Sequence, residues 1–385
     1  MSHRRTVAFI AALISIVPAI AFAAPACAED LPPEWTVMVY MDGDNDLEAS
    51  ALADLAEMTA AGSDEDVNIV VLLDTLSGPA DLLYVAEGST QTIAEWGEVA
   101  MDDGANLVMF MTTVEALYPA QRTALVMYDH GGGLFGLCWD DTTGVDECIR
   151  LPELADALDQ AGADLDLLVF NACLMGQAEI AFQVAHHADI VVFSEEIMSI
   201  RGFEWHLAFD GLRADPTMDG TALGLLLGAN YAANNAAATG SLFTVSVCRS
   251  ADMLAVADAF AAAADAQVAA MDEYASVFKE CRNRAEEVEA YGPVDVIEYM
   301  SNVAGSGKID DLTVRSTAQQ VVDAVEEAIL YHWALQWVEG MNGLGVYFPR
   351  NNTQEEWTVD GEVYSALPFC QETGWDAFLA AYDAA

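Results

Sequence analysis

Short apolar segments alternate with amphipathic ones along the first half of the chain, and this alternation is what most limits the possible folds. The apolar segments are rich in β-branched and aromatic residues, so they are predicted to be strands at 35–41, 67–73, 124–128, 165–170 and 190–193. Strands that are apolar along their whole length are buried on both faces. The pattern therefore predicts an α/β fold in which helices cover both faces of a mostly parallel sheet.

Helices are expected between these strands, at 47–59, 106–116, 151–161 and 175–185, with a hairpin over 82–93. The later part is more helical, with helices predicted at 221–233, 251–277 and 313–337 and strands at 242–247 and 344–348. No linker rich in Pro, Gly or Ser separates the two parts. We therefore expect residues 29–385 to form a single domain, with a core at about 35–205 and a helical C-terminal portion at about 220–385.

The first 28 residues have the features of a secretory signal peptide. Arg4 and Arg5 precede an apolar run at 7–22, and Ala26-Cys27-Ala28 is a small-x-small cleavage site. We expect cleavage near Ala28 and a secreted or periplasmic protein. A membrane anchor and a lipid-anchored Cys27 are the weaker alternatives. No later segment has 18 uninterrupted apolar residues, so stable membrane insertion of the mature chain is not expected.

The chain is strongly acidic, with 62 Asp and Glu against 13 Lys and Arg and a net charge of -49. Such a charge repels nucleic acids and anionic membranes and attracts cationic substrates. It also favours a monomer, because copies of the chain repel one another.

Seven cysteines are present, and in an oxidising compartment some of those after the signal peptide should pair. Cys138 and Cys148 flank a polar loop and are the expected disulfide. No spacing typical of a zinc site occurs, so no metal centre is predicted. The segment 42–46 (DGDND) has the first acid spacings of a calcium loop but lacks its later Gly and Glu. We expect no cofactor, with weak calcium binding as the secondary expectation.

His130 and Cys173 each follow the end of a predicted parallel strand. Polar residues at that edge of a sheet form sites. Histidine can accept a thiol proton near neutral pH, and a helix beginning after Cys173 would favour the thiolate. Gly131 beside the base leaves room for backbone N–H groups of an oxyanion hole. Taken singly, a cysteine after a strand is usually a core residue, and a histidine beside glycines usually marks a turn.

The two segments that contain these residues, 128–133 (YDHGGG) and 170–176 (FNACLMG), resemble the active-site motifs of clostripain-like cysteine peptidases. That family belongs to the clan of the caspases, gingipains and legumains. Segments 39–48, 193–196, 343–349 and 373–379 resemble further parts of the family pattern. The resemblance implies a caspase-like α/β/α sandwich and a Cys-His dyad. Cys173 would attack the scissile carbonyl, His130 would protonate the leaving amine, and the backbone at Gly131 and Cys173 would form the oxyanion hole.

One position departs from the pattern of family members that cleave after Arg or Lys. These members resemble one another in having Asp two residues before the nucleophile, where this chain has Asn171. Arg201 falls near the position of a second expected acid, and it lines the substrate pocket or is a solvated loop residue. Glu195 and Glu196 are candidate replacement acids, and so is Glu204. The P1 preference, basic or instead acidic or polar, therefore stays open.

Family members are often cleaved between the His and Cys motifs. The polar segment 140–153 contains a single basic residue, Arg150, so self-cleavage near Arg150 into two chains is expected. The functional prediction is a secreted cysteine endopeptidase acting on peptide or protein substrates. The alternative is a non-catalytic secreted protein of the same fold that binds peptides or protein partners, because Asn171 points to a changed pocket.

Overall fold

The strands of the larger sheet run in the order β10-β8-β7-β6-β5-β1-β2-β3-β4. They are seen in a computed structural model that describes residues 31–142, 148–288, 292–350, 358–359 and 362–385. The predicted signal peptide at 1–28 lies outside the described residues. Residues from Pro32 onward form one compact unit.

Five strands at the centre of this sheet are parallel, and both edges are antiparallel. The parallel strands are β7 (Ala188–Phe193), β6 (Leu165–Asn171), β5 (Arg122–Tyr128), β1 (Trp35–Gly43) and β2 (Val67–Thr75). The antiparallel edges are β3 (Gly78–Ala86) with β4 (Ser89–Gly97), and β8 (Thr244–Arg249) with β10 (Ile329–Ala334). The predicted mostly parallel central sheet is confirmed.

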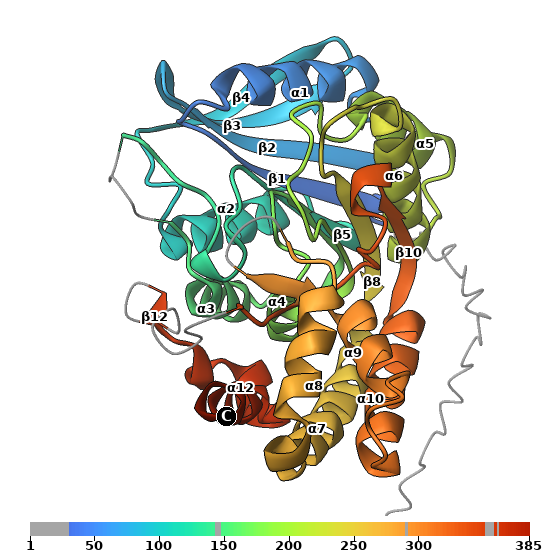
Figure 1. The fold of residues 1–385 in the computed structure, drawn as a ribbon. Helices are drawn as coiled ribbons and strands as arrows, with labels where there is room; N and C mark the ends of the chain where they lie inside the picture. Colours follow the sequence, from blue (N-terminus) through green and yellow to red (C-terminus); the bar gives the residue numbers. More distant parts are fainter. Residues whose placement is uncertain (1–30, 143–147, 289–291, 351–357, 360–361) are drawn as a thin grey trace, which may run out of the picture. The chain divides into compact units, whose positions relative to one another are not determined.

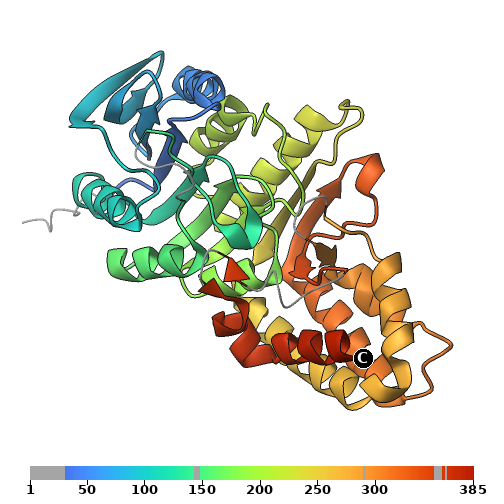
Figure 2. The ribbon, with the colours of Figure 1, turned by 60° about the vertical axis from the view of Figure 1, so that its left-hand side comes forward.

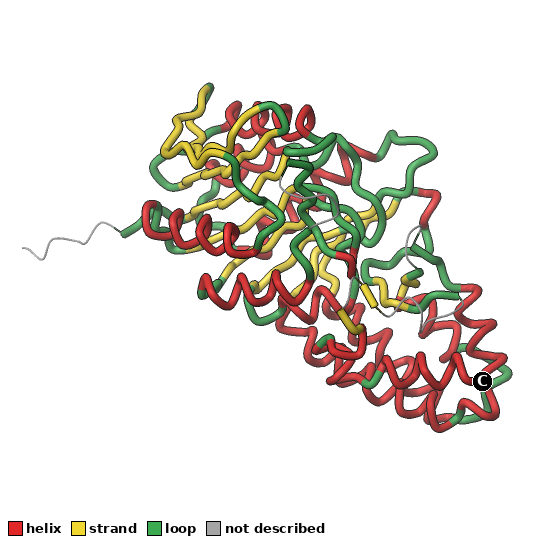
Figure 3. The backbone as a smooth tube through the Cα atoms, turned by 90° about the vertical axis from the view of Figure 1, so that its left-hand side faces the viewer, coloured by secondary structure: helices red, strands yellow, loops and turns green. Residues whose placement is uncertain are grey.

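Helices cover both faces of the sheet (Figure 3). In β1, Met38 and Tyr40 belong to one core, and Val37, Val39 and Met41 belong to the other. The second core also contains buried residues of α1 (Glu48–Ala61), α5 (Trp205–Ala214) and α6 (Gly220–Asn235). The first contains those of α2 (Gly104–Leu117), α3 (Leu151–Ala161) and α4 (Ala178–Val184). This α/β/α arrangement confirms the predicted fold class.

The C-terminal portion is mostly helical, and its helices gather beneath the sheet in Figure 1 and lie together again in Figure 2. The helices are α7 (Met253–Ala269), α8 (Met271–Arg284), α9 (Val296–Ala304), α10 (Leu312–Ala328), α11 (Pro368–Thr373) and α12 (Trp375–Ala384). Two small sheets pair β9 (Pro293–Asp295) with β11 (Gly345–Tyr347), and β12 (Thr358–Val359) with β13 (Glu362–Val363). Short 3-10 turns are Gly133–Phe135, Ser250–Asp252, Gln336–Val338 and Tyr364–Ala366.

Three predicted helices differ from the structure. The segment 251–277 is divided, because α7 ends at Ala269 and α8 starts at Met271. The segment 313–337 is helical only to Ala328, and its aromatic end is strand β10, which pairs with β8. Bulky residues at 329–333 favour a strand once a neighbouring edge is available. Helix α4 starts at Ala178, three residues later than the predicted start at 175.

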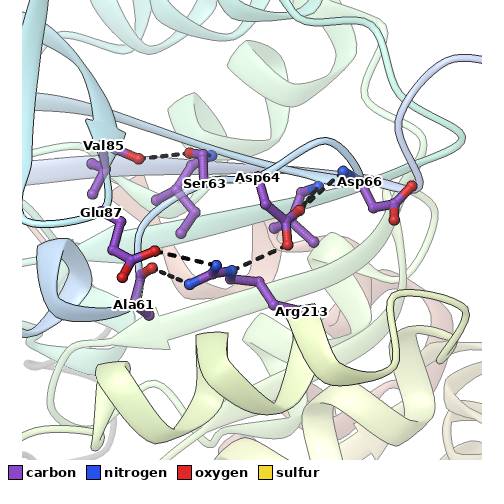
Figure 4. Close-up of polar contacts among 9 residues, drawn as sticks. Ala61, Ser63, Asp64, Asp66, Val85, Glu87 and Arg213 are labelled. Carbon is purple, nitrogen blue, oxygen red and sulfur yellow. Dashed lines mark hydrogen bonds and ion pairs between the residues drawn. The ribbon is translucent and has the colours of Figure 1, made fainter.

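Arg213 of α5 fixes the end of α1, as Figure 4 shows. Its guanidinium donates to Asp64 Oδ2 at 3.1 Å and to the carbonyl of Ala61, the last residue of α1. Glu87 lies 3.5 Å away as a third partner. α5 and α1 are thereby held together on one face of the sheet. Among the described residues, no helix is both long and apolar enough to cross a bilayer.

Candidate active site

The two predicted catalytic residues lie at the carboxyl ends of neighbouring parallel strands. His130 follows β5 and Cys173 follows β6. The chain passes from β1 to β2 on one side of β1, and β5 lies on the other side. Loops diverge at such a switch point and leave a crevice. The loop after β1 therefore reaches the same place and brings Asn45 and Asp46 to the site.

Gly131 allows the His130 loop and the Cys173 loop to touch. A Cβ atom at Gly131 would lie 2.1 Å from the carbonyl oxygen of Cys173 and 2.8 Å from its nitrogen. Neither contact is sterically possible, so only glycine fits here. Gly133 has φ 61°, and a Cβ atom there would lie 2.1 Å from Nε2 of Gln177. Gly131 thus permits a close approach of two backbone segments, and Gly133 leaves room for the Gln177 side chain.

His130 is held from the side of β1. Its Nε2 lies 2.7 Å from Oδ1 of Asp46, and the His130 side chain is 42% exposed. The preceding Asp129 is buried, and its carboxylate accepts hydrogen bonds from Asn45 Nδ2 at 2.7 Å and from the Trp139 N–H at 2.5 Å. Burial raises the pKa of Asp129. These bonds fix the backbone next to the imidazole, and Asp46 orients the ring.

Cys173 is half-buried, and its Sγ accepts a hydrogen bond from the Met198 N–H at 3.2 Å. Burial raises the pKa of the Cys173 thiol; the nearby charges of Asp129 and Glu196 raise it further, and the Met198 hydrogen bond lowers it. The expectation that a helix dipole favours the thiolate is not met, because α4 begins only at Ala178. The thiol is therefore protonated near neutral pH before substrate binds.

Two backbone N–H groups beside the thiol are available to a ligand. Those of Gly131 and Cys173 donate to no other residue in the described part of the chain. The Gly131 backbone lies against that of Cys173, as the short distances above show. Two such donors close to a nucleophile are what an oxyanion hole requires.

A cavity of about 160 Å³ opens next to this pair. It is lined by His130, Cys173 and residues of the loops after β1, β5, β6 and β7, together with α1. The lining residues are Leu47, Ser50, Asp54, Tyr128, Asp129, His130, Asn171, Ala172, Cys173, Met198, Ser199, Ile200 and Gly202. Of the predicted pocket residues, only Asn171 is among them.

The other predicted pocket residues lie elsewhere. Arg201 is exposed and does not line the cavity. Glu195 and Glu196 are buried, and their N–H groups both donate to the Thr244 hydroxyl. The Glu195 carboxylate also accepts from the Gly343 N–H at 2.6 Å, so this acid joins the end of β7 to the C-terminal portion. These three residues are close to the Cys173 motif in the sequence, but their side chains do not line the pocket.

Sequence reasoning missed two acids of the site, Asp46 and Asp54. The sequence places Asp46 in a loop with calcium-like spacing and in segment 39–48 of the family pattern, but indicates no role for it at the site. Asp54 belongs to the buried face of α1, together with Ala51, Met58 and Ala61. A charged residue in register with an apolar helix face is a detectable signal, because burying it is costly without a functional reason.

Arg150 precedes α3 directly, and its carbonyl accepts the hydrogen bond that starts this helix. Cys148 and Ile149 before it are buried, and Ile149 pairs with Leu137. The expected exposed processing loop is therefore ordered on this side, whereas residues 143–147 lie outside the described part.

All six described cysteines are free, so the predicted Cys138–Cys148 disulfide is absent from the structure. The two thiols flank the Leu137–Ile149 pair and are buried there, where the Cys148 thiol donates to the Phe135 carbonyl at 3.1 Å. Both act as small buried residues, as free cysteines commonly do.

Two groups of side chains have the spacing of metal ligands. Oxygens of Asp44, Asp74 and Glu98 lie within 4.8 Å of one another, as do ligand atoms of Glu57, Glu204 and His206. In the first group, Asp44 and Asp74 are fully buried, and burial raises the pKa of Asp74 to about 7. Such a group of oxygens suits a hard cation such as calcium.

Comparison with known proteins identifies the family of the chain. The model of the clostripain family matches residues 39–382. Clostripain from Hathewaya histolytica is 29% identical over 222 residues, which are 46% of this chain and 42% of that protein. The match thus spans less than half the length of this relative.

Solved structures show the same fold. A secreted C11 cysteine protease from Bacteroides thetaiotaomicron, bound to an irreversible peptide inhibitor, has a TM-score of 0.70 and 19% identity, and the match covers 89% of this chain and 99% of that one. An inactive zymogen C11 protease from Parabacteroides distasonis has a TM-score of 0.68 and 18% identity, with 89% and 98% covered. With the family match over most of its length, the chain belongs to the clostripain family of cysteine peptidases.

Proposed function

We propose that this protein is a cysteine endopeptidase in which Cys173 is the nucleophile and His130 the general acid and base. The main support is the cavity that both side chains line, next to two backbone N–H groups without other partners among the described residues. A peptide carbonyl placed there would contact the thiol and both donors.

The reaction begins from a neutral thiol, because burial raises the pKa of Cys173. His130 takes the thiol proton as the sulfur attacks the scissile carbonyl carbon. The N–H groups of Gly131 and Cys173 stabilise the oxyanion that forms. His130 then gives the proton to the leaving amine, and the C–N bond breaks to leave a thioester. Water, deprotonated by His130, hydrolyses the thioester and regenerates the thiol.

Asp46 is a positioning residue for His130 in this scheme. Its carboxylate contacts Nε2 at 2.7 Å but is 84% exposed, so the contact is screened by solvent. With Nε2 at Asp46, Nδ1 is the ring nitrogen left to exchange a proton with the thiol.

Export is part of the proposal, with cleavage of the signal peptide near Ala28 and a monomeric mature chain. Self-cleavage near Arg150 is proposed as the activation step. It requires opening of the first turn of α3, since Arg150 directly precedes that helix. Calcium is proposed as an accessory ion at Asp44, Asp74 and Glu98, not as part of the chemistry.

The test is a positional-scanning fluorogenic peptide assay on the exported chain, with Cys173→Ala and His130→Ala as matched inactive variants. We expect cleavage by the wild type and a loss of at least about 10³-fold in both variants. Mass spectrometry of the same samples would show a fragment boundary near Arg150 only with intact Cys173. Absence of cleavage for every P1 residue would instead support the non-catalytic binding protein.

A further inference from the structure

Family members that cleave after Arg or Lys have Asp two residues before the nucleophile, where this chain has Asn171, yet the cavity still contains a buried carboxylate. We infer that Asp54, contributed by α1, is the acid that makes this pocket select a basic P1 side chain. The inference rests on the proposed peptidase function, and it concerns the specificity of that same site.

Asp54 reaches the place where Asn171 would meet a substrate side chain. Both residues line the cavity beside Cys173. A Cβ atom at Gly202 would lie 3.3 Å from Oδ2 of Asp54 and 3.6 Å from Oδ1 of Asn171. The carboxylate and the amide oxygen therefore lie on the same side of Gly202, one contributed by α1 and the other by the end of β6. Because residue 202 is glycine, it adds no side chain on that side of the cavity.

Among the described residues, no cation pairs with the buried Asp54 carboxylate. Its side chain is 5% exposed, and Oδ2 accepts no hydrogen bond with normal geometry from any residue that the structure describes. The Tyr128 hydroxyl and the Trp205 indole lie near enough to lower its pKa, but burial outweighs them and raises the pKa to about 7. No Arg or Lys is among the residues that line the cavity. A buried acid in this state gains most from a cation that enters from the cavity.

The walls of the cavity suit the stem of a basic side chain. Leu47, Met198 and Ile200 are apolar lining residues that can contact the methylene groups of Arg or Lys. The guanidinium or ammonium group would then reach Asp54, with the Asn171 oxygen as a second acceptor. The alternatives fail on position, because Glu195 and Glu196 are buried outside the cavity and Arg201 is exposed.

The test compares two peptides that differ only at P1, one with arginine and one with citrulline, its uncharged isostere. For the wild type we expect kcat/KM to favour arginine by about 100-fold, as for a desolvated charge pair. Asp54→Asn should reduce this ratio to about 1 while citrulline cleavage continues. Asp210→Asn removes an exposed acid from α5 and should leave the ratio unchanged.

Two further measurements make the test specific. The arginine preference of the wild type should grow as pH rises through about 7, where Asp54 ionises, and should be flat in Asp54→Asn. Asn171→Asp added to Asp54→Asn should restore the arginine preference, because it returns an acid to the same cavity. Restoration would also show that the Asp54→Asn chain is folded.

An arginine preference that survives Asp54→Asn, or a wild-type preference for acidic or neutral P1 residues, would overturn the inference but not the peptidase function. If no peptide is cleaved, the proposed function fails, and the role of Asp54 in the pocket is then tested by measuring peptide binding. Calorimetry on Cys173→Ala should show tighter binding of the arginine peptide, and Asp54→Asn in that background should remove the difference. Equal binding of the two peptides would overturn the inference.

Discussion

Asp54 and Asp295 are both buried acids with raised pKa values, but they differ in what surrounds them. Asp54 faces a cavity, and one of its oxygens has no hydrogen-bond donor among the residues described. Asp295 accepts three hydrogen bonds, from the Glu298 N–H and from the backbone and side-chain amides of Asn342. One site is left open to a ligand, and the other is closed by the protein itself.

This difference distinguishes a buried carboxylate that can bind a ligand from one that stabilises the fold. Donors that satisfy a buried carboxylate make it part of the scaffold, as at Asp295, which joins β9 to the loop before β11. A carboxylate that lacks them at a cavity wall is energetically costly until a ligand supplies a partner. Mutation should therefore lower the free energy of unfolding much more at Asp295 than at Asp54.

The largest expected effect is on stability. Asp295→Ala removes the buried acceptor of three part-buried N–H donors, and we expect it to lower the free energy of unfolding by about 4 kcal/mol. Asp54→Ala should cost no more than about 1 kcal/mol, because fewer bonds are lost. Urea denaturation followed by tryptophan fluorescence measures both. Equal losses in the two variants would show that Asp54 is also part of the scaffold.

The second effect is the pH dependence of stability. The pKa of Asp54 is about 7 in the folded chain, whereas an unfolded aspartate titrates near 4. The unfolded chain therefore releases this proton first as pH rises, so the stabilisation present at low pH is lost as pH approaches 7. Between pH 5 and 7, we expect the free energy of unfolding to fall by about 2 kcal/mol less in Asp54→Asn than in the wild type.

The matched comparison is the difference in unfolding free energy between wild type and Asp54→Asn, measured at each pH. Asp210→Asn, which changes an exposed acid, serves as the control with the same charge change. If this difference in unfolding free energy stays constant across the pH range, Asp54 is already ionised in the folded chain. Asp54 would then titrate like an ordinary surface acid.

The third effect concerns the thiol. Because burial raises the pKa of Cys173, its alkylation by iodoacetamide should accelerate about tenfold per pH unit between pH 6 and 8. His130→Ala should change this rate less than twofold, since His130 contacts Asp46 in the resting site, yet it should abolish peptide cleavage. A pH-independent fast rate, lost in His130→Ala, would indicate a preformed thiolate–imidazolium pair.

Much of the fold followed from the sequence because buried parallel strands have a strong local signal. The strands before His130 and Cys173 were predicted within a few residues, and the strand ends placed both residues at one edge. The acid of the pocket could not be predicted from the sequence, because Asp54 belongs to α1, which is far in sequence from either motif. Strand β10 was also missed, since its apolar aromatic residues fit a helix until β8 offers an edge for pairing.

The smallest expected effect is at a third group of acids, intermediate between the two sites compared above. Asp44 and Asp74 are buried like Asp295, but Glu98 is exposed, so an ion has access. In the described parts of the chain, no donor with normal geometry reaches either oxygen of Asp44, although the Thr142 hydroxyl is near enough to lower its raised pKa. A weakly bound calcium ion should therefore raise Tm by about 2 °C. Asp44→Asn should abolish this shift, whereas Asp210→Asn should keep it; a shift of the same size in Asp44→Asn would place the ion elsewhere.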